Sequence, residues 1–148
     1  MKVVKVEEKK IQGISVRTTN LEEDSPDTAK IGALFARFDK NVSVNYKAGC
    51  RVHGVYHDYD SDENSGFEVL VGSDQAFSAT EKLETVTIEA GNYLLFEGKG
   101  EMPQAVVDVW LKVWKYFGGK NVKYQRVFTT DFEIYKNPNE VDVYISIR

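Results

Sequence analysis

The segment at residues 131–147 alternates apolar and polar side chains in two runs that flank the sequence Asn-Pro-Asn. These three residues favour turns, and the alternation is typical of half-buried strands, so the segment predicts a β-hairpin. In the first strand Phe132 and Ile134 share one face, because successive side chains point to opposite faces of a sheet. Glu133 and Tyr135 share the other face. A carboxylate held beside an aromatic ring on a rigid strand is suited to the floor of a cavity, where it would select a cation.

The second strand of the hairpin repeats the alternation. Its apolar residues are Val141, Val143, Ile145 and Ile147, and the residues between them are Asp142, Tyr144 and Ser146. We therefore expect Tyr135 and Tyr144 on the face of the hairpin opposite its apolar set.

Strand and helix patterns follow the same order twice along the chain. The first unit, at about 11–73, contains a strand, a helix and two strands at 12–18, 27–39, 51–59 and 67–72. A connecting strand at 83–88 leads to the second unit, at about 90–147, in which a strand at 92–97 and a helix at 103–117 precede the hairpin. Strand–helix–strand–strand repeated twice predicts an α+β domain with a mainly antiparallel sheet and two helices on one face. We expect the two units to be related by a pseudo-twofold axis, with a central ligand cleft where they meet.

Each predicted helix carries an apolar stripe at three- and four-residue steps. The first stripe comprises Ile31, Leu34, Phe35 and Phe38, and the second comprises Val106, Val109, Trp110, Val113, Trp114 and Phe117. Pro26 suits the start of the first helix, because proline lacks only a donor that would be unpaired there. Gly118 and Gly119 are suited to end the second helix.

Length and charge narrow the class of protein. A chain of 148 residues is expected to form one domain, over residues 1–148. The formal net charge of −4 argues against direct binding of nucleic acid, which needs a basic face. Cys50 is the one cysteine, so no internal disulfide forms, and a reducing compartment fits. The N-terminus lacks the apolar core of a secretory signal, and no apolar run reaches the roughly 20 residues of a membrane span. These features predict a cytoplasmic protein without a membrane partner.

Three segments, at residues 88–100, 103–117 and 131–147, carry a family resemblance. They contain the runs Glu-Ala-Gly-Asn-Tyr, Pro103 followed by Trp110 and Trp114, and Phe-Glu-Ile-Tyr around Glu133. Together they make the chain similar to the GyrI-like (AraC-type) effector-binding domain family. That family includes the drug-binding modules of multidrug-responsive transcription regulators, and stand-alone versions carried on integron gene cassettes.

The resemblance implies two strand–helix–strand–strand modules around a ligand cleft, in which Glu133 pairs with cationic, lipophilic ligands and aromatic rings stack on them. The DNA-binding domain of the family's regulators has no room within this chain, so we expect no direct contact with DNA. A separate DNA-binding regulator or a homodimer is a possible partner. Two alternatives stay open: a GyrI-like hydrolase with Glu133 as general base assisted by Tyr135 or Tyr93, and an inhibitor that binds gyrase or another protein.

The remaining candidates for ligand contact are mainly aromatic. Trp110 and Trp114 share a helix face, and their plain alternative is core packing, to which aromatic stripes usually belong. The other candidates, whose alternative roles are structural or solvent-facing, are Phe35, Tyr56, Tyr93, Tyr135 and Glu68.

The residues argue against a metal site and against a nucleophilic triad. The acidic run at 57–66 fails the arithmetic of a calcium loop, since glycine and glutamate are missing at the required positions, and it predicts a solvated hairpin turn. Cys50, His53 and His57 lack the paired spacing of a zinc site. No signature of a nucleophilic triad is present. We therefore expect neither metal nor cofactor.

Overall fold

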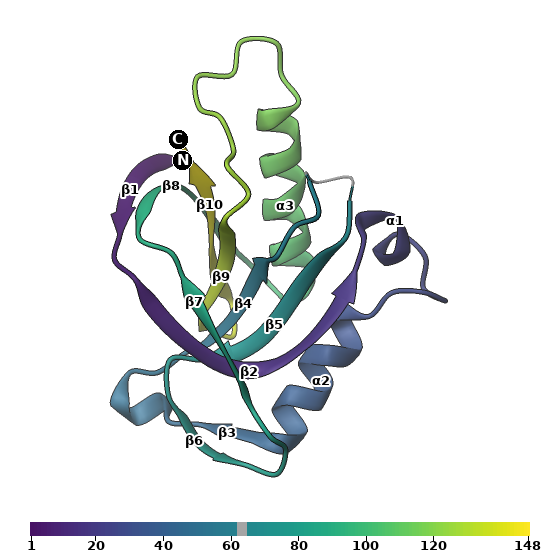
Figure 1. Cartoon of the computed structure of the whole chain (residues 1–148), viewed down its shortest axis with the longest axis vertical. Helices are drawn as coiled ribbons and strands as arrows, with labels where there is room; N and C mark the ends of the chain where they lie inside the picture. The colour runs from purple at the N-terminus through teal and green to yellow at the C-terminus, as the bar shows by residue number, and fades with distance from the viewer. Residues whose placement is uncertain (62–64) are drawn as a thin grey trace.

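A computed structural model describes residues 1–61 and 65–148, and within them an antiparallel sheet of eight strands curls into a half barrel (Figure 1). The order across the sheet is β1-β8-β10-β9-β4-β5-β2-β7. The strands are β1 (Lys2–Val6), β2 (Lys9–Thr18), β4 (Val52–His57), β5 (Phe67–Ser73), β7 (Glu84–Ile88), β8 (Gly91–Lys99), β9 (Thr130–Asn137) and β10 (Glu140–Ile147). The predicted α+β class is confirmed.

Two longer helices lie on the same side of the curled sheet (Figure 1). The helices are α1 (Asn20–Glu23), α2 (Ile31–Asn41) and α3 (Gln104–Phe117), with a 3-10 turn at Tyr46–Ala48. A small second sheet pairs β3 (Val42–Val44) with β6 (Ala76–Ala79). No helix in the described residues is long and apolar enough to cross a membrane.

The repeated order predicted from the sequence is present. The first unit is β2-α2-β4-β5 and the second is β8-α3-β9-β10. Across the sheet the second unit runs β8-β10-β9 and the first continues as β4-β5-β2, which is the order that a pseudo-twofold axis produces. The two units join where β4 pairs with β9, and Gly54 lies opposite Glu133 in that ladder. This junction places Glu133 close to the middle of the sheet.

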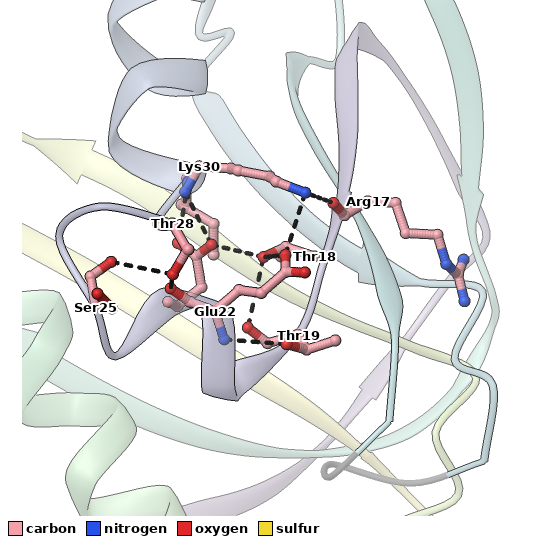
Figure 2. Close-up of polar contacts among 9 residues, drawn as sticks. Arg17, Thr18, Thr19, Glu22, Ser25, Thr28 and Lys30 are labelled. Carbon is pink, nitrogen blue, oxygen red and sulfur yellow. Dashed lines mark hydrogen bonds and ion pairs between the residues drawn. The ribbon is translucent and has the colours of Figure 1, made fainter.

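The first helix begins later than the sequence predicts. Pro26 lies in a turn after α1, and α2 starts at Ile31. The carboxylate of Glu23 accepts hydrogen bonds from the backbone N–H groups of Lys30 (2.9 Å) and Ile31 (3.0 Å), so it caps the helix from a distant segment. The ammonium of Lys30 donates to the backbone carbonyl of Arg17 (3.0 Å) and closes this segment onto β2 (Figure 2). The prediction of the helix start from Pro26 is therefore wrong, because the cap that sets the start is the side chain of Glu23.

The edge strand β1 was not predicted. Its sequence, Lys-Val-Val-Lys-Val at residues 2–6, is short and does not alternate strictly, so it carries little periodic signal. In the structure it pairs antiparallel with β8, from Lys2 opposite Leu95 to Val6 opposite Gly91. The small β3–β6 sheet was missed for the same reason, because strands of three and four residues carry little periodic signal.

Both faces of the sheet are buried, and for this reason the sequence-based assignment of faces in the hairpin is partly wrong. On the side of the helices, Val141 and Val143 lie opposite Tyr135 and Glu133. On the other side the ring of Phe132 stacks on Tyr144, at 4.5 Å and an interplanar angle of 8°. The prediction that Tyr135 and Tyr144 share a face is wrong, because each strand of the hairpin turns its apolar set to a different face.

Helix α3 packs closely on β8 at a glycine. A Cβ on Gly98 would overlap the side chain of Val109. Val109 and Val113 are buried against the sheet, in a core that includes Leu94 and Val143. This packing fixes the depth and rotation of α3 and turns Trp110 toward the centre of the sheet.

Candidate functional site

A cavity of about 580 Å³ lies between α2, α3 and the central strands. Most of its lining is aromatic or aliphatic, with a few polar groups among the apolar ones. The lining residues are Asn20, Glu23, Ile31, Gly32, Phe35, Tyr56, Tyr59, Phe67, Met102, Pro103, Val106, Val107, Trp110, Trp114, Arg126, Glu133 and Tyr135. This composition, and a volume within the usual range of about 300–1,000 Å³, are those of a small-molecule site.

The carboxylate of Glu133 is buried in the cavity wall, with the residue 2% exposed. It accepts hydrogen bonds from the indole N–H of Trp110 (2.6 Å) and from the hydroxyls of Tyr56 and Tyr135 (both 2.9 Å). The donors come from α3, β4 and β9, so the two units of the fold meet at this one group. All three donors are neutral.

Gly54 provides the space for this carboxylate. A Cβ at Gly54 would lie 2.5 Å from Oε1 of Glu133 and 3.5 Å from the ring of Phe35. The glycine is therefore required by a close approach of a neighbouring side chain, across the β4–β9 ladder. A single methyl group here would force the carboxylate to move.

Burial determines the electrostatics of the group. It raises the pKa of Glu133, and the hydrogen bonds from its three donors oppose that rise. Burial and the neighbouring carboxylate also raise the pKa of Tyr56 and of Tyr135, so both tyrosines stay protonated and act as donors. The result is a carboxylate held in place by neutral dipoles in a weakly polar wall.

Aromatic rings form the walls on both sides of Glu133. Tyr56 packs edge-on against Trp110, with ring centroids 5.0 Å apart, and Trp110 lies 6.3 Å from Trp114. Phe35 of α2 packs edge-on against Tyr135 at 5.4 Å. Trp114 is 44% exposed, so it stands at the rim while Trp110 lies deeper.

A second polar group lines the cavity close to the first. The guanidinium of Arg126 pairs with the buried carboxylate of Asp131 at 2.7 Å. The same carboxylate accepts hydrogen bonds from the hydroxyl of Tyr59 (2.6 Å) and from the backbone N–H (2.8 Å) and hydroxyl (3.0 Å) of Ser146. Arg126 lies over the ring of Phe128, 4.3 Å from its centroid.

The structure brings six of the eight predicted site residues together around the cavity. They are Phe35, Tyr56, Trp110, Trp114, Glu133 and Tyr135. The prediction for Tyr93 and Glu68 differs from the structure, since both lie on the opposite face of the sheet. The hydroxyl of Tyr93 donates to the carbonyl of Glu89 (2.6 Å), and Glu68 forms an ion pair with Arg17 (3.5 Å). Both residues were predicted at the site because their strands were expected to border the cleft. The sequence did not determine which face of the sheet each side chain takes.

Several lining residues were not predicted. Val106 was assigned to the core stripe of α3, although it lies one turn before Trp110 and so shares its face. Phe67 is the first residue of β5 and points to the helix side, which alternation alone leaves ambiguous. Arg126 lies outside the named strands and helices, so no periodic pattern signalled it. Tyr59 was expected at the end of the strand at 51–59, but β4 ends at His57.

Cys50 and His53, considered in the sequence as zinc ligands, have other partners in the structure. Among the described residues, no group of three His, Cys, Asp or Glu side chains is arranged to hold a metal ion. Buried Cys50 contacts the side chain of Gln75 (3.8 Å), and both ring nitrogens of His53 are hydrogen-bonded, to the Arg51 carbonyl and to Lys9. Part of the predicted acidic turn, at 62–64, lies outside the described residues.

A curled antiparallel sheet with two helices beside an aromatic cavity defines the class, an effector-binding domain. The chain belongs to the Cass2 family of integron-associated effector binding proteins, whose sequence profile matches residues 2–147. It is similar to an integron cassette protein from the mobile metagenome of Vibrio cholerae, with 36% identity, a TM-score of 0.90, and 99% of this chain and 95% of that chain covered. The resemblance found in the sequence is thereby confirmed.

More distant relatives match over most of this chain. The structure of SAV2435 bound to tetraphenylphosphonium matches with a TM-score of 0.61 and 12% identity, over 99% of this chain and 93% of that chain. YobU of Bacillus subtilis, named as a candidate transcriptional regulator, is 22% identical over 95% of this chain and 92% of its own length.

Proposed function

We propose that this protein is a small-molecule binding module for amphipathic or lipophilic organic cations, with Glu133 as the counter-charge inside the cavity. The observation that carries the proposal is the buried carboxylate of Glu133 with three neutral donors. A buried anion without a cation is costly, because neutral hydrogen bonds replace its hydration only in part. An organic cation entering the cavity relieves that cost.

The surroundings of Glu133 strengthen the attraction for such a ligand. Opposite charges attract more strongly where water is excluded, and the lining is largely apolar. A flat or branched aromatic cation also stacks on the rings of Trp110, Tyr56 and Phe35, where each good cation–π contact contributes about 0.5–2 kcal/mol. Ring stacking tolerates many shapes, so one charge and several rings give broad selectivity.

The likeness to SAV2435 supports the choice of ligand class. That protein is bound to tetraphenylphosphonium, a lipophilic cation without hydrogen-bond donors. A ligand of this kind matches a cavity that offers aromatic surface and one carboxylate.

The test is a titration of intrinsic tryptophan fluorescence with two ligands of matched shape. Tetraphenylphosphonium is a cation, and tetraphenylborate is an anion of nearly the same size. We expect saturable quenching by the cation and little or none by the anion, because Trp110 touches Glu133 directly. Glu133→Gln should weaken binding of the cation by at least about tenfold, since it removes one partner of a buried charge pair.

Glu68→Gln is the matched control, because it makes the same change on the opposite face of the sheet. It should leave the affinity for tetraphenylphosphonium unchanged. Equal affinities for the two ligands, or an affinity unaffected by Glu133→Gln, would refute the proposal.

A hydrolase is the second candidate, and the 2.9 Å contact between Tyr135 and Glu133 is the observation that favours it. Such an enzyme needs a lone pair on Glu133 to accept a proton from water, whereas three donors already engage that carboxylate, which offers about four lone-pair sites. Steady release of nitrophenol from an activated ester such as p-nitrophenyl butyrate, abolished by Glu133→Gln, would favour the enzyme. Saturable binding without turnover favours the passive module.

A further inference from the structure

The cavity contains a positively charged side chain that the binding of simple cations does not use. Arg126 lines the same cavity as Glu133, and its side chain is 8% exposed. The ring of Phe128 packs on the guanidinium at 4.3 Å and that of Phe117 lies 5.8 Å away, so two aromatic residues contact the group. It is therefore a fixed part of the cavity wall.

This arginine has more hydrogen-bonding capacity than its partner takes up. A guanidinium carries five N–H donors, and the ion pair with Asp131 is made through Nη2. The buried Nε of Arg126 has no hydrogen-bond partner in the described part of the chain. Asp131, by contrast, is satisfied on both oxygens by Tyr59, Ser146 and Arg126. Within this ion pair, it is Arg126 that keeps unused hydrogen-bond donors.

The spacing of the two polar groups sets the geometry of a ligand that reaches both. Asp131, which anchors Arg126, and Glu133 are two residues apart on β9, so they share a face at a separation of about 7 Å. Tyr59, which bonds Asp131, and Tyr56, which bonds Glu133, both line the cavity and both contact Phe67, with ring centroids 5.7 and 5.9 Å away. A continuous aromatic surface joins the two polar groups.

We infer that the preferred effectors of this protein are bipolar: an aromatic organic cation whose positive end meets Glu133 and which also carries a carboxylate that meets Arg126. The inference rests on the proposed function and narrows its ligand class. The carboxylate of such a ligand accepts hydrogen bonds from the planar donor edge of the guanidinium, the geometry in which arginine binds carboxylates best.

A pair of dyes that differ in one group tests the inference. Rhodamine B is a zwitterion at neutral pH, and its ethyl ester keeps the cationic ring system but masks the carboxylate. Binding is followed by the fluorescence anisotropy of each dye. We expect wild-type protein to bind both, and Arg126→Gln to weaken rhodamine B by about tenfold while changing the ester less than about twofold, because a hydrogen bond to a charged group is lost for rhodamine B alone.

Two controls keep the result interpretable. Arg37→Gln makes the same substitution at an exposed arginine that pairs with Glu81 outside the cavity, and should affect neither dye. Because Arg126→Gln leaves the Asp131 charge buried without a cation, the double variant Arg126→Gln/Asp131→Asn repeats the test with the pair neutralised. Glu133→Gln should weaken both dyes.

The outcomes separate the two proposals. Equal losses for both dyes in Arg126→Gln and in the double variant, or no loss for either, overturn the role of Arg126 and leave the cation module standing. Failure of the ester to bind, or ester binding unaffected by Glu133→Gln, overturns the cation module and with it the bipolar ligand. Selective loss of rhodamine B in either Arg126 variant supports the inference.

Discussion

Two buried carboxylates lie two residues apart on the same face of β9 and are partnered in opposite ways. Asp131 is bonded by the guanidinium of Arg126, the hydroxyl of Tyr59, and the hydroxyl and backbone N–H of Ser146. Glu133 is bonded by three neutral donors. Among the described residues a counter-charge lies beside Asp131, whereas the donors to Glu133 are neutral. We expect the first arrangement to stabilise the fold, and under the proposed function the second leaves a charge for a ligand to neutralise.

The largest expected difference between Asp131 and Glu133 is in how much each contributes to the free energy of unfolding. Asp131→Asn leaves the guanidinium of Arg126 buried and unpaired, and we expect a loss of about 3–5 kcal/mol in the free energy of unfolding. Glu133→Gln removes a charge that has no charged partner among the described residues, so the loss should stay below about 1 kcal/mol or become a gain. Urea unfolding followed by circular dichroism measures both. Similar losses would mean that the two groups play the same structural role.

Gly54→Ala tests whether the position of Glu133 matters, independently of its charge. The added methyl group would displace the carboxylate, and we expect affinity for tetraphenylphosphonium to fall about tenfold. Gly32→Ala is the matched control, because Gly32 also lines the cavity but its Cβ would meet open space. That change should stabilise α2 by about 0.5–1 kcal/mol with little effect on affinity. Equal affinities in the two variants would show that the carboxylate does not need its present position.

The pH dependence of stability should also depend on Glu133. Its pKa in the folded protein is raised by burial above the ordinary value of 4.5, so the folded state favours the protonated group. This contribution to stability is fully present below the ordinary value and is lost as pH rises through the raised one. Affinity for a cation should change in the opposite sense, increasing over the same range as Glu133 ionises. Unfolding and titration experiments across that range, on wild type and Glu133→Gln, check both trends; identical pH profiles would contradict them.

The two tryptophans should differ in their contribution to stability, and the change at Trp114 is the smallest effect that we expect. Trp114→Phe should change stability by less than about 0.5 kcal/mol, because the side chain is 44% exposed and is replaced by another ring. Trp110→Phe removes a hydrogen bond to a charged group and should cost about 1.5–3 kcal/mol. Thermal unfolding of the two variants measures the difference, and a larger loss for Trp114 would contradict the assignment of rim and interior.

The sequence predicted the site correctly where the period of a strand or helix determines the face to which a side chain points. Alternation in the hairpin placed Glu133 and Tyr135 together, and the helical period placed Trp110 and Trp114 on one face; all four line the cavity. Tyr93 was expected near the cavity from its strand alone, without an assigned face. Both faces of this sheet are buried, and the ring of Tyr93 packs in the core on the face away from the helices.

Other parts of the site carried no sequence signal. Arg126 lies beyond the end of α3 in an irregular segment, and its ion pair depends on a strand five residues later. The start of α2 depends on Glu23, which caps the helix across a turn and also lines the cavity. Contacts of this kind arise from three-dimensional arrangement, which residue-type preferences do not encode.

The three hydrogen bonds at Glu133 have a mechanical consequence. They tie helix α3, strand β4 of the first unit and strand β9 of the second to a single pair of oxygen atoms. A ligand that draws this carboxylate into the cavity would weaken or redirect all three hydrogen bonds at once. Occupancy of the cavity and the packing of α3 against the two central strands would then be coupled through one side chain.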